Sequence, residues 1–387
     1  MRTDFAKPLY FDYNATTPTD PRVVEAMLPY FTEHFGNPES SQHAYGWKAK
    51  TAVEKARAQV ANLIGATPNE IVFTSGSTES LNLAILGYLE GQAPGRHIIT
   101  SAAEHKATLE AFHRAEKLGH EITLLPVNRY GQVELETLQK AIQPNTVLVS
   151  LMHANNEVGS LNPIAEIGAW LKTRGDIVFH VDAAQTAGKH PIDVKAMNID
   201  MLSVSAHKLY GPKGVGALYI NRPHVHINPL VKGGGQERGL RGGTHNVPGI
   251  VGFGVACEIA QNVIPEEPNR LAYLRDKIIR AVTFPGSGVE LNGHPTDRLC
   301  NNVHLSFHVG ADRLLTGLSN IAFSTASACS AGGASHVLKA MGRDSSDPLF
   351  TTARFSLGRF TTEEEVDYLI ERLKAFTKKE SMVSMTY

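Results

Sequence analysis

Residues 200–212 read Asp200-Met-Leu-Ser-Val-Ser205-Ala-His207-Lys208-Leu-Tyr-Gly-Pro212, a short apolar run that leads into a lysine and a turn. An apolar run bounded by Gly and Pro is typical of a buried strand. Lys208 then lies at the carboxyl edge of a sheet, where open α/β folds bind their ligands. Burial lowers the pKa of an amine, and a neutral amine can bond to an aldehyde. A surface lysine in a turn is the alternative for this residue taken alone.

A second strand-like run lies upstream and ends in a carboxylate. It reads Ile177-Val-Phe-His-Val-Asp182-Ala-Ala-Gln185. Two parallel strands that end side by side would bring Asp182, Gln185 and Lys208 to one edge of the sheet. A pyridoxal phosphate ring requires this set, with a carboxylate for its nitrogen, a donor for its phenolic oxygen and an amine for its aldehyde. For Asp182 alone, a helix N-cap is an equally good explanation.

The chain around these strands alternates between strand-like and helical patterns. A helical pattern over 51–64 stops at Gly65, and further helical patterns separate most of the strands. This alternation predicts an α/β fold with a mainly parallel sheet covered on both faces. The seven strand-like runs lie at 70–74, 97–101, 122–126, 146–152, 177–182, 200–205 and 215–220.

A break in a long helical pattern divides the chain. The helix that begins near Val247 is interrupted at Ile264-Pro-Glu-Glu-Pro268, and a smaller α+β pattern follows. We therefore expect a large domain over 18–262. We expect a small α+β domain formed by 1–17 and 263–387.

Composition limits the possible functions. The 387 residues include 42% hydrophobic and 19% charged residues and carry a formal net charge of -1, so no basic field for nucleic acid is evident. Three cysteines make no disulfide framework and indicate a reducing compartment. The first residues lack the apolar run of a signal peptide, and no run of 18 apolar residues occurs. We expect a cytoplasmic protein without membrane or direct nucleic-acid contacts.

Polar residues at a strand-to-helix junction are candidate phosphate ligands. Ser75-Gly-Ser77-Thr78-Glu79 would present backbone N–H groups and hydroxyls to an anion at the positive end of a helix. An ordinary capped helix start explains the same motif. Ser205 and His207, beside the lysine, and Thr244, in the looser Arg241-Gly-Gly-Thr244 turn, are further candidates.

Two residues that follow strands are candidates for contacts with the cofactor ring. His105 lies in Ala102-Ala-Glu-His105-Lys106, where an imidazole could stack on a flat ring and move protons. Asn156, in His153-Ala-Asn-Asn156-Glu, could reach the ring oxygen from the sheet edge. His224 and His226 are the nearest approach to a metal-ligand pair, but no third ligand stands at useful spacing, so we expect no metal.

Two residues of the smaller unit are candidates for the chemistry itself. Cys329 lies in Ser324-Thr-Ala-Ser-Ala-Cys329-Ser-Ala-Gly-Gly-Ala334, and such small residues suit an exposed thiol that acts as a nucleophile. Cys257 and Cys300 instead have the surroundings of small core residues. Arg354 could clamp an amino-acid carboxylate, although an ion pair is the equal alternative.

The combination of these motifs resembles the cysteine desulfurases, pyridoxal-phosphate enzymes of the aspartate-aminotransferase fold (PLP fold type I). The group that it resembles carries Ser-Ala-Cys in its loop. The likeness runs in order from about Leu9 to Asp367. It rests on Asp12-Tyr-Asn-Ala-Thr-Thr-Pro, Gly36-Asn-Pro, Phe73-Thr-Ser-Gly-Ser-Thr-Glu, Glu104-His-Lys, Asn155-Asn-Glu-Val-Gly, Val181-Asp-Ala-Ala-Gln, Ser205-Ala-His-Lys, Arg241-Gly-Gly-Thr and Ser327-Ala-Cys-Ser.

The resemblance implies a role for each candidate. Lys208 binds the cofactor covalently and later removes the Cα proton of L-cysteine, while Cys329 takes the sulfur as a persulfide and releases L-alanine. Arg354, with Asn37, binds the substrate carboxylate. Thr244 reaches the phosphate from the other subunit, which implies a homodimer. The remaining cofactor ligands are Ser77, Thr78, His105, Asn156, Asp182, Gln185, Ser205 and His207.

One departure from the family pattern leaves the sulfur acceptor open. After Cys329 the family often has a longer stretch before Ser-His-Val-Leu, which begins here at Ser335. The acceptor could be an iron–sulfur scaffold, which we rank first, a tRNA-thiolation protein or a DNA-phosphorothioation system. A cysteine, cystine or selenocysteine lyase that does not need Cys329, and a sulfur carrier without turnover, are the alternative functions.

Overall fold

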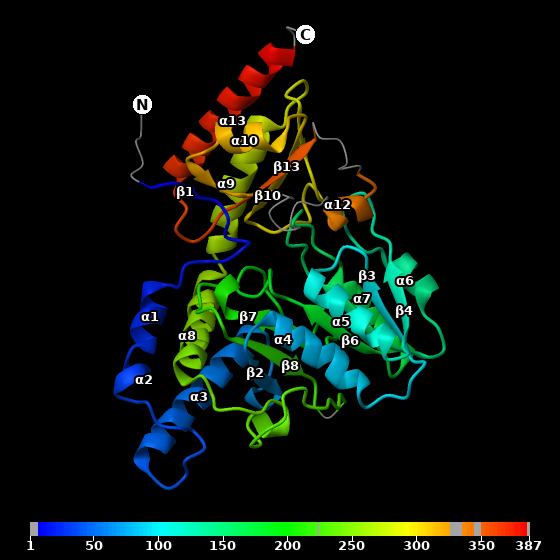
Figure 1. Cartoon of the computed structure of the whole chain (residues 1–387), viewed down its shortest axis with the longest axis vertical. Coiled ribbons are helices and arrows are strands. Elements are labelled where there is room, and N and C mark those ends of the chain that lie inside the picture. The colour runs from blue at the N-terminus through cyan, green and yellow to red at the C-terminus, as the bar shows by residue number, and fades with distance from the viewer. Residues whose placement is uncertain (1–6, 223, 326–334, 344–349, 385–387) are drawn as a thin grey trace.

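The computed structural model describes residues 7–222, 224–325, 335–343 and 350–384. Figure 1 shows a large sheet flanked by helices in its lower part. A smaller sheet lies in the upper part, beside the long helix α13 (Glu363–Ser384). The predicted α/β class with a mainly parallel seven-stranded sheet is confirmed.

The large sheet has the strand order β2-β8-β7-β6-β5-β3-β4. One strand, β8, runs antiparallel to both of its neighbours, and every other neighbouring pair is parallel. Parallel pairing brings the carboxyl ends of β5, β6 and β7 to the same edge, as the sequence predicts. The bounds are β2 (Ile71–Thr74), β3 (His97–Ser101), β4 (Glu121–Leu125), β5 (Thr146–Met152), β6 (Val178–Asp182), β7 (Met201–Ser205) and β8 (Gly216–Ile220).

Helices cover both faces of the large sheet. Along β6, Phe179 and Val181 join one buried apolar cluster, and Val178 joins another on the opposite face. Successive strand residues point to opposite faces, and all five residues of β6 are buried, so this strand is covered on both sides. The helices of this part are α1 (Pro21–Met27), α2 (Pro29–Thr32), α3 (Ala44–Leu63), α4 (Ser77–Asn82), α5 (Lys106–Lys117), α6 (Leu135–Ala141), α7 (Ile164–Leu171) and α8 (Val247–Val263).

The smaller unit has its own buried cluster, built on a four-stranded antiparallel sheet of order β12-β13-β10-β9. A short parallel pair, β1 with β11, joins the N-terminal segment to this unit. The division into two domains, with boundaries at 17/18 and 262/263, stays a prediction. The bounds are β1 (Leu9–Tyr10), β9 (Val289–Leu291), β10 (Asn302–Phe307), β11 (Ile321–Ala322), β12 (Ser324–Thr325), β13 (Thr351–Ser356), α9 (Glu267–Val282), α10 (Ala311–Gly317), α12 (His336–Ala340) and α13 (Glu363–Ser384).

The helix α3 starts earlier than its sequence pattern indicates. The helix α3 begins well before residue 51, because the side chain of His43 caps it by accepting from the N–H of Gly46.

Within the described residues, no single helix is long and apolar enough to cross a membrane. The pair α8 and α9 passes that test by length and composition but is bent by 74°.

Candidate active site

A cavity of about 550 Å³ opens at the carboxyl ends of β6 and β7. These strands end at Asp182 and Ser205, and Lys208 follows directly in a short 3-10 turn. Ten of the residues predicted from the sequence line this cavity, namely Ser77, Thr78, His105, Asn156, Asp182, Gln185, Ser205, His207, Lys208 and Arg354.

The amine of Lys208 is held by backbone carbonyls of the N-terminal segment. Its Nζ donates to the carbonyl oxygens of Asn14, at 2.6 Å, and Ala15, at 2.7 Å. Burial lowers the pKa of Lys208 to about 7, and the positive charges of Lys189 and Arg354 act in the same direction. A large fraction of the amine is therefore neutral near neutral pH, as a nucleophile or base must be.

Asp182 and His105 are held in fixed orientations by backbone N–H groups. The Oδ1 atom of Asp182 accepts from the N–H of Ala184, and burial raises the pKa of this carboxyl group. The Nδ1 atom of His105 accepts from the N–H of Ala107, because His105 is the N-cap of α5. Burial lowers the pKa of His105, so the neutral ring carries its proton on Nε2.

The N-terminus of α4 opens into the cavity. Gly76 precedes it with φ of 148°, a conformation that other residues rarely adopt. Ser77 and Thr78 form its first turn, and the buried Ser77 hydroxyl has no hydrogen-bond partner in the described part of the chain. This arrangement presents donors to an anion at the positive end of the helix, although α4 alone is short.

Polar side chains on the other walls complete the cavity. Gln185 Nε2 donates to the carbonyl of Asn14, while its buried Oε1 lacks a partner among the described residues. His207 Nδ1 lies 3.1 Å from the hydroxyl of Thr16, and burial lowers the pKa of His207 to about 4. The ring of His207 is therefore neutral at physiological pH.

Arg354 is the buried cation of this site. Its Nη2 lies 2.7 Å from Oδ1 of Asp12 and also donates to the Ser324 hydroxyl, and its Nη1 donates to the carbonyl of Asn156. Its side chain is 5% exposed, and its Nε has no partner among the residues described. Three N–H groups of the guanidinium thus fix it at the cavity wall, and its Nε–H is not engaged by any residue that the structure describes.

Two predicted residues do not line the cavity of this chain, and one cannot be placed. Asn37 and Thr244 are exposed and lie outside the cavity-lining set. Cys329 falls outside the described residues. Cys257 is buried in the core and Cys300 packs against the second cluster, as predicted, and burial raises the pKa of both thiols, that of Cys300 to about 11.

The described residues on either side of segment 326–334 are joined to the cavity wall. Before it, the Ser324 hydroxyl donates to the carboxylate of Asp12. After it, His336 Nε2 lies 2.8 Å from the carbonyl oxygen of Glu104, and Glu104 precedes His105. Ser324 and His336, which flank Cys329 in the sequence, therefore both lie beside the candidate site.

Sequence reasoning missed three kinds of contact at this site. It treated residues 12–18 as an irregular polar segment, whereas the carbonyls of Asn14 and Ala15 hold Lys208. It gave no role to Asp12 or to the buried Lys189. The motif Asp12-Tyr-Asn-Ala-Thr-Thr marked this segment, but the sequence could not show that its backbone carbonyls bind Lys208, because every residue has a backbone carbonyl.

The histidines His224 and His226 lie away from this site, in a second cavity. Among the residues that the structure describes, no group of three or more His, Cys, Asp or Glu side chains is placed to hold a metal ion.

Comparison with known proteins identifies the family. The model of the aminotransferase class-V family matches residues 9–369. The chain belongs to this family. A cysteine desulfurase IscS from Anaeromyxobacter dehalogenans (strain 2CP-C) is 48% identical over 385 residues, which cover 98% of this chain and 95% of that protein. These matches confirm the cysteine desulfurase family predicted from the sequence motifs.

Two solved structures have the same fold. One, titled NIFS-LIKE PROTEIN, has a TM-score of 0.88 and 40% identity and covers 96% of this chain and 99% of its own. Another, titled SspA in complex with cysteine, has a TM-score of 0.79 and 38% identity and covers 92% of this chain and 100% of its own.

Proposed function

We propose that this chain is a pyridoxal-phosphate-dependent cysteine desulfurase that converts L-cysteine to L-alanine and leaves a persulfide on Cys329. The observation that carries the proposal is the convergence of the Lys208 amine, the Asp182 carboxylate and the Arg354 guanidinium on one cavity. The family supports the same reaction.

The donor set of the cavity fits pyridoxal phosphate. Ser77 Oγ and Gln185 Oε1 are buried polar atoms without partners among the described residues, and such atoms normally indicate a missing ligand. Ser77, Thr78, Ser205 and His207 would hold the phosphate, and Asp182 would pair with the ring nitrogen. A cationic nitrogen beside Asp182 would lower the pKa that burial raises, so this carboxylate would be charged when the group is bound.

The bound cofactor supplies an electron sink that stabilises negative charge at the substrate Cα. The neutral amine of Lys208, whose pKa is about 7, removes the proton from this carbon. His105 would lie against the ring of the bound cofactor and would offer its Nε2 proton, since its Nδ1 accepts from the N–H of Ala107. Asn156 and Gln185 fix the phenolic side of the ring.

Arg354 binds the carboxylate of L-cysteine through its guanidinium fork, together with Asn37. The solved relative SspA is a complex with cysteine, which supports this substrate. The thiolate of Cys329 attacks the substrate sulfur, so that an S–S bond forms as the Cβ–S bond breaks. The carbon skeleton gains a proton and leaves as L-alanine.

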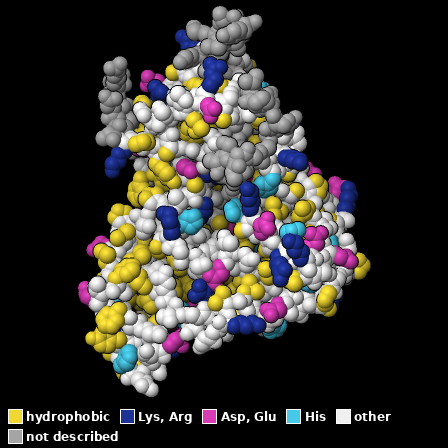
Figure 2. All heavy atoms as spheres, in the orientation of Figure 1, with side chains coloured by type: hydrophobic (Ala, Val, Ile, Leu, Met, Phe, Trp, Pro, Cys, Tyr) yellow, Lys and Arg dark blue, Asp and Glu magenta, His cyan; other side chains and the backbone are white. Residues whose placement is uncertain are grey.

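The working form is a homodimer in this proposal. Asn37 and Thr244 lie outside the cavity of their own chain, so they act in the cavity of a second copy. Figure 2 shows hydrophobic side chains gathered at the lower left, over α1 and α2. The exposed large apolar residues of α2, of the residues next to it and of the start of α3 are Leu28 (59%), Phe31 (60%), Phe35 (65%), Tyr45 (56%) and Trp47 (56%). Exposure of many large apolar side chains at one surface marks a protein interface.

Beyond the reaction, we propose a cytoplasmic protein that passes sulfur to an acceptor protein, most often in this family an iron–sulfur scaffold. No direct role in membrane or nucleic-acid binding is proposed. We retain the division into a large domain over 18–262 and a small domain over 1–17 and 263–387.

The experiment that tests the proposal supplies L-cysteine and a reductant to the purified protein reconstituted with pyridoxal phosphate. Alanine and sulfide should form in equal amounts. Cys329→Ala and Lys208→Ala should each abolish both products, whereas Cys257→Ala should retain them. Turnover by Cys329→Ala at the wild-type rate would instead favour a lyase that needs no enzyme thiol.

A further inference from the structure

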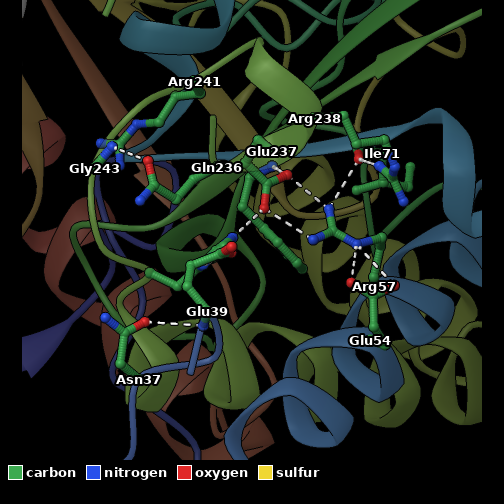
Figure 3. A network of polar contacts seen from close by, with 12 residues as sticks. Asn37, Glu39, Glu54, Arg57, Ile71, Gln236, Glu237, Arg238, Arg241 and Gly243 are labelled. Carbon is green, nitrogen blue, oxygen red and sulfur yellow. Dashed lines mark hydrogen bonds and ion pairs between the residues drawn. The ribbon is translucent and has the colours of Figure 1, made fainter. Parts of the chain in front are cut away.

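We propose that Glu237 is a positioning residue that acts between subunits, holding in one chain the loops that complete the pocket of the other. The inference rests on the proposed homodimer. It concerns a buried charge network that lies outside the cavity and has no role in the chemistry described above (Figure 3).

The carboxylate of Glu237 takes donors from three segments of the chain. Arg57 on α3 contributes Nη1 at 2.7 Å and Nη2 at 2.8 Å, and the backbone N–H of Phe73 on β2 donates at 2.8 Å. His245 Nε2 lies 2.7 Å from the other oxygen of Glu237. The side chains of Arg57 and Glu237 are only 3% and 2% exposed, so this ion pair is shielded from solvent.

The backbone at this point adopts a conformation that its residues do not favour. Glu237 has φ of 50° and Arg238 has φ of 57°, both in the left-handed region. Non-glycine residues stay there only where the surrounding contacts determine the conformation. The bidentate pair with Arg57 supplies that constraint, and Arg238 adds a contact to Asn69.

Of the two residues that the proposed dimer needs from its other chain, Thr244 is joined to this carboxylate through His245, and Asn37 lies on a loop beside it. Thr244 directly precedes His245, and Gly243 donates its N–H to the side chain of Gln236. On the second loop, a carboxylate oxygen of Glu39 lies 3.9 Å from Nδ1 of His245, beyond hydrogen-bond distance, and the N–H of Glu39 donates to the side chain of Asn37. Figure 3 shows the two loops meeting at this network.

The same loop reaches the rim of its own cavity. Arg241 Nε donates to Glu79 at 2.8 Å, and Glu79 accepts from the N–H of Ser75 at the start of α4. The loop therefore touches the pocket of its own chain through Arg241 while presenting Thr244 outward. A change at Glu237 should displace Thr244 most, because His245 next to it is bonded to this carboxylate, so the defect should appear in the partner's pocket.

The inference is tested with heterodimers in which only one pocket, called here the live pocket, can attach pyridoxal phosphate covalently. One chain carries Lys208→Ala, so only the pocket of the other chain attaches pyridoxal phosphate covalently. Two affinity tags purify the mixed pair. We expect Glu237→Gln on the Lys208→Ala chain to weaken cofactor attachment at the live pocket by roughly ten- to a hundredfold, by spectral titration, because small misplacements of positioning groups have effects of that size. The same change on the live chain should have little effect.

The reverse pattern, or equal effects from both chains, would overturn the inference. If Glu237→Gln does not fold, His245→Ala replaces it, because this change leaves the Arg57 pair intact. His245→Ala should then weaken cofactor attachment when it is on the Lys208→Ala chain and should have little effect on the live chain. Glu136→Gln, in the exposed pair with Lys140, is the matched control and should change nothing on either chain.

Thr244→Ala, placed either on the Lys208→Ala chain or on the live chain, distinguishes a failure of this inference from a failure of the proposed homodimer. If Thr244→Ala acts only within its own chain, the proposed dimeric architecture is wrong. If it acts across the dimer while Glu237→Gln acts within its own chain or not at all, the architecture stands and the role of Glu237 is wrong.

Discussion

The Nζ atom of Lys208 lies 2.6 Å from the carbonyl oxygen of Asn14, a residue 194 positions earlier in the sequence. Gln185 Nε2 donates to the same oxygen. The segment around Asn14 thereby joins the ends of β6 and β7 across the cavity. Residues 12–17 belong to the site as firmly as the strands of the large sheet do.

The first prediction concerns the pH dependence of cofactor attachment. The pKa of Lys208 is lowered to about 7, so the neutral, reactive amine increases as pH rises through that value. Covalent attachment of pyridoxal phosphate should therefore accelerate between about pH 6 and about pH 8 and then level off. Stopped-flow absorbance measures this rate. A rate that keeps rising toward the usual pKa of lysine would show that the amine is not perturbed.

The second prediction concerns Lys189, a buried cation whose Nζ donates to the carbonyl of Gln185. Its charge helps to lower the pKa of Lys208. Lys189→Met removes the charge and keeps an unbranched side chain, so the midpoint of the attachment profile should move to higher pH. Lys195→Met is the control and should leave the midpoint unchanged. An unchanged midpoint for Lys189→Met would contradict the electrostatic role.

The third prediction concerns the substrate carboxylate. Asp12 and Arg354 form an ion pair at 2.7 Å, with Ser324 bonded to both. Asp12→Asn should loosen the guanidinium and raise the KM for L-cysteine by about tenfold, since a hydrogen bond to a charged group contributes about 1.5–3 kcal/mol. Arg354→Lys should raise KM at least as much, because an ammonium cannot form the bidentate pair. Equal KM values in wild type and Asp12→Asn would refute the coupling.

The fourth prediction concerns stability and Glu104, which is fully buried and accepts from the N–H of Met152. Burial raises its pKa well above 4.5, so the folded chain keeps a proton that the unfolded chain releases. This carboxyl group must therefore reduce the free energy of unfolding as pH rises above about 4.5, by at most about 1.4 kcal/mol per pH unit.

Glu104→Gln keeps the acceptor for Met152 and removes the titration. The variant should gain stability relative to wild type between about pH 5 and about pH 7. Denaturant unfolding at several pH values measures this difference. Parallel pH profiles for the two proteins would mean that Glu104 is charged in the folded state.

The sequence predicted the strands well because apolar runs bounded by turn residues carry a strong signal. The expected runs at 97–101 and 146–152 coincide with β3 and β5. It placed the start of α3 too late, because histidine is not a usual N-cap and the His43 contact arises only in three dimensions.

The sequence likewise predicted some features of the site and not others. Residues whose side chains do the chemistry, such as Lys208 and Asp182, stand at strand ends and could be predicted there. Contacts between distant segments could not. Arg57 and Glu237 are separated by 180 residues and belong to a helix and a loop without a shared motif. The acceptors for Lys208 are backbone carbonyls, which any sequence provides.

The central claim is that sulfur passes from L-cysteine to Cys329 at the site built around Lys208. A single turnover with L-cysteine and no reductant, followed by peptide mass spectrometry, tests it most directly. We predict one added sulfur atom on Cys329, one alanine per modified thiol and no modification in Lys208→Ala. Alanine production with an unmodified Cys329, or sulfur bound to Cys257 or Cys300 instead, would contradict the account.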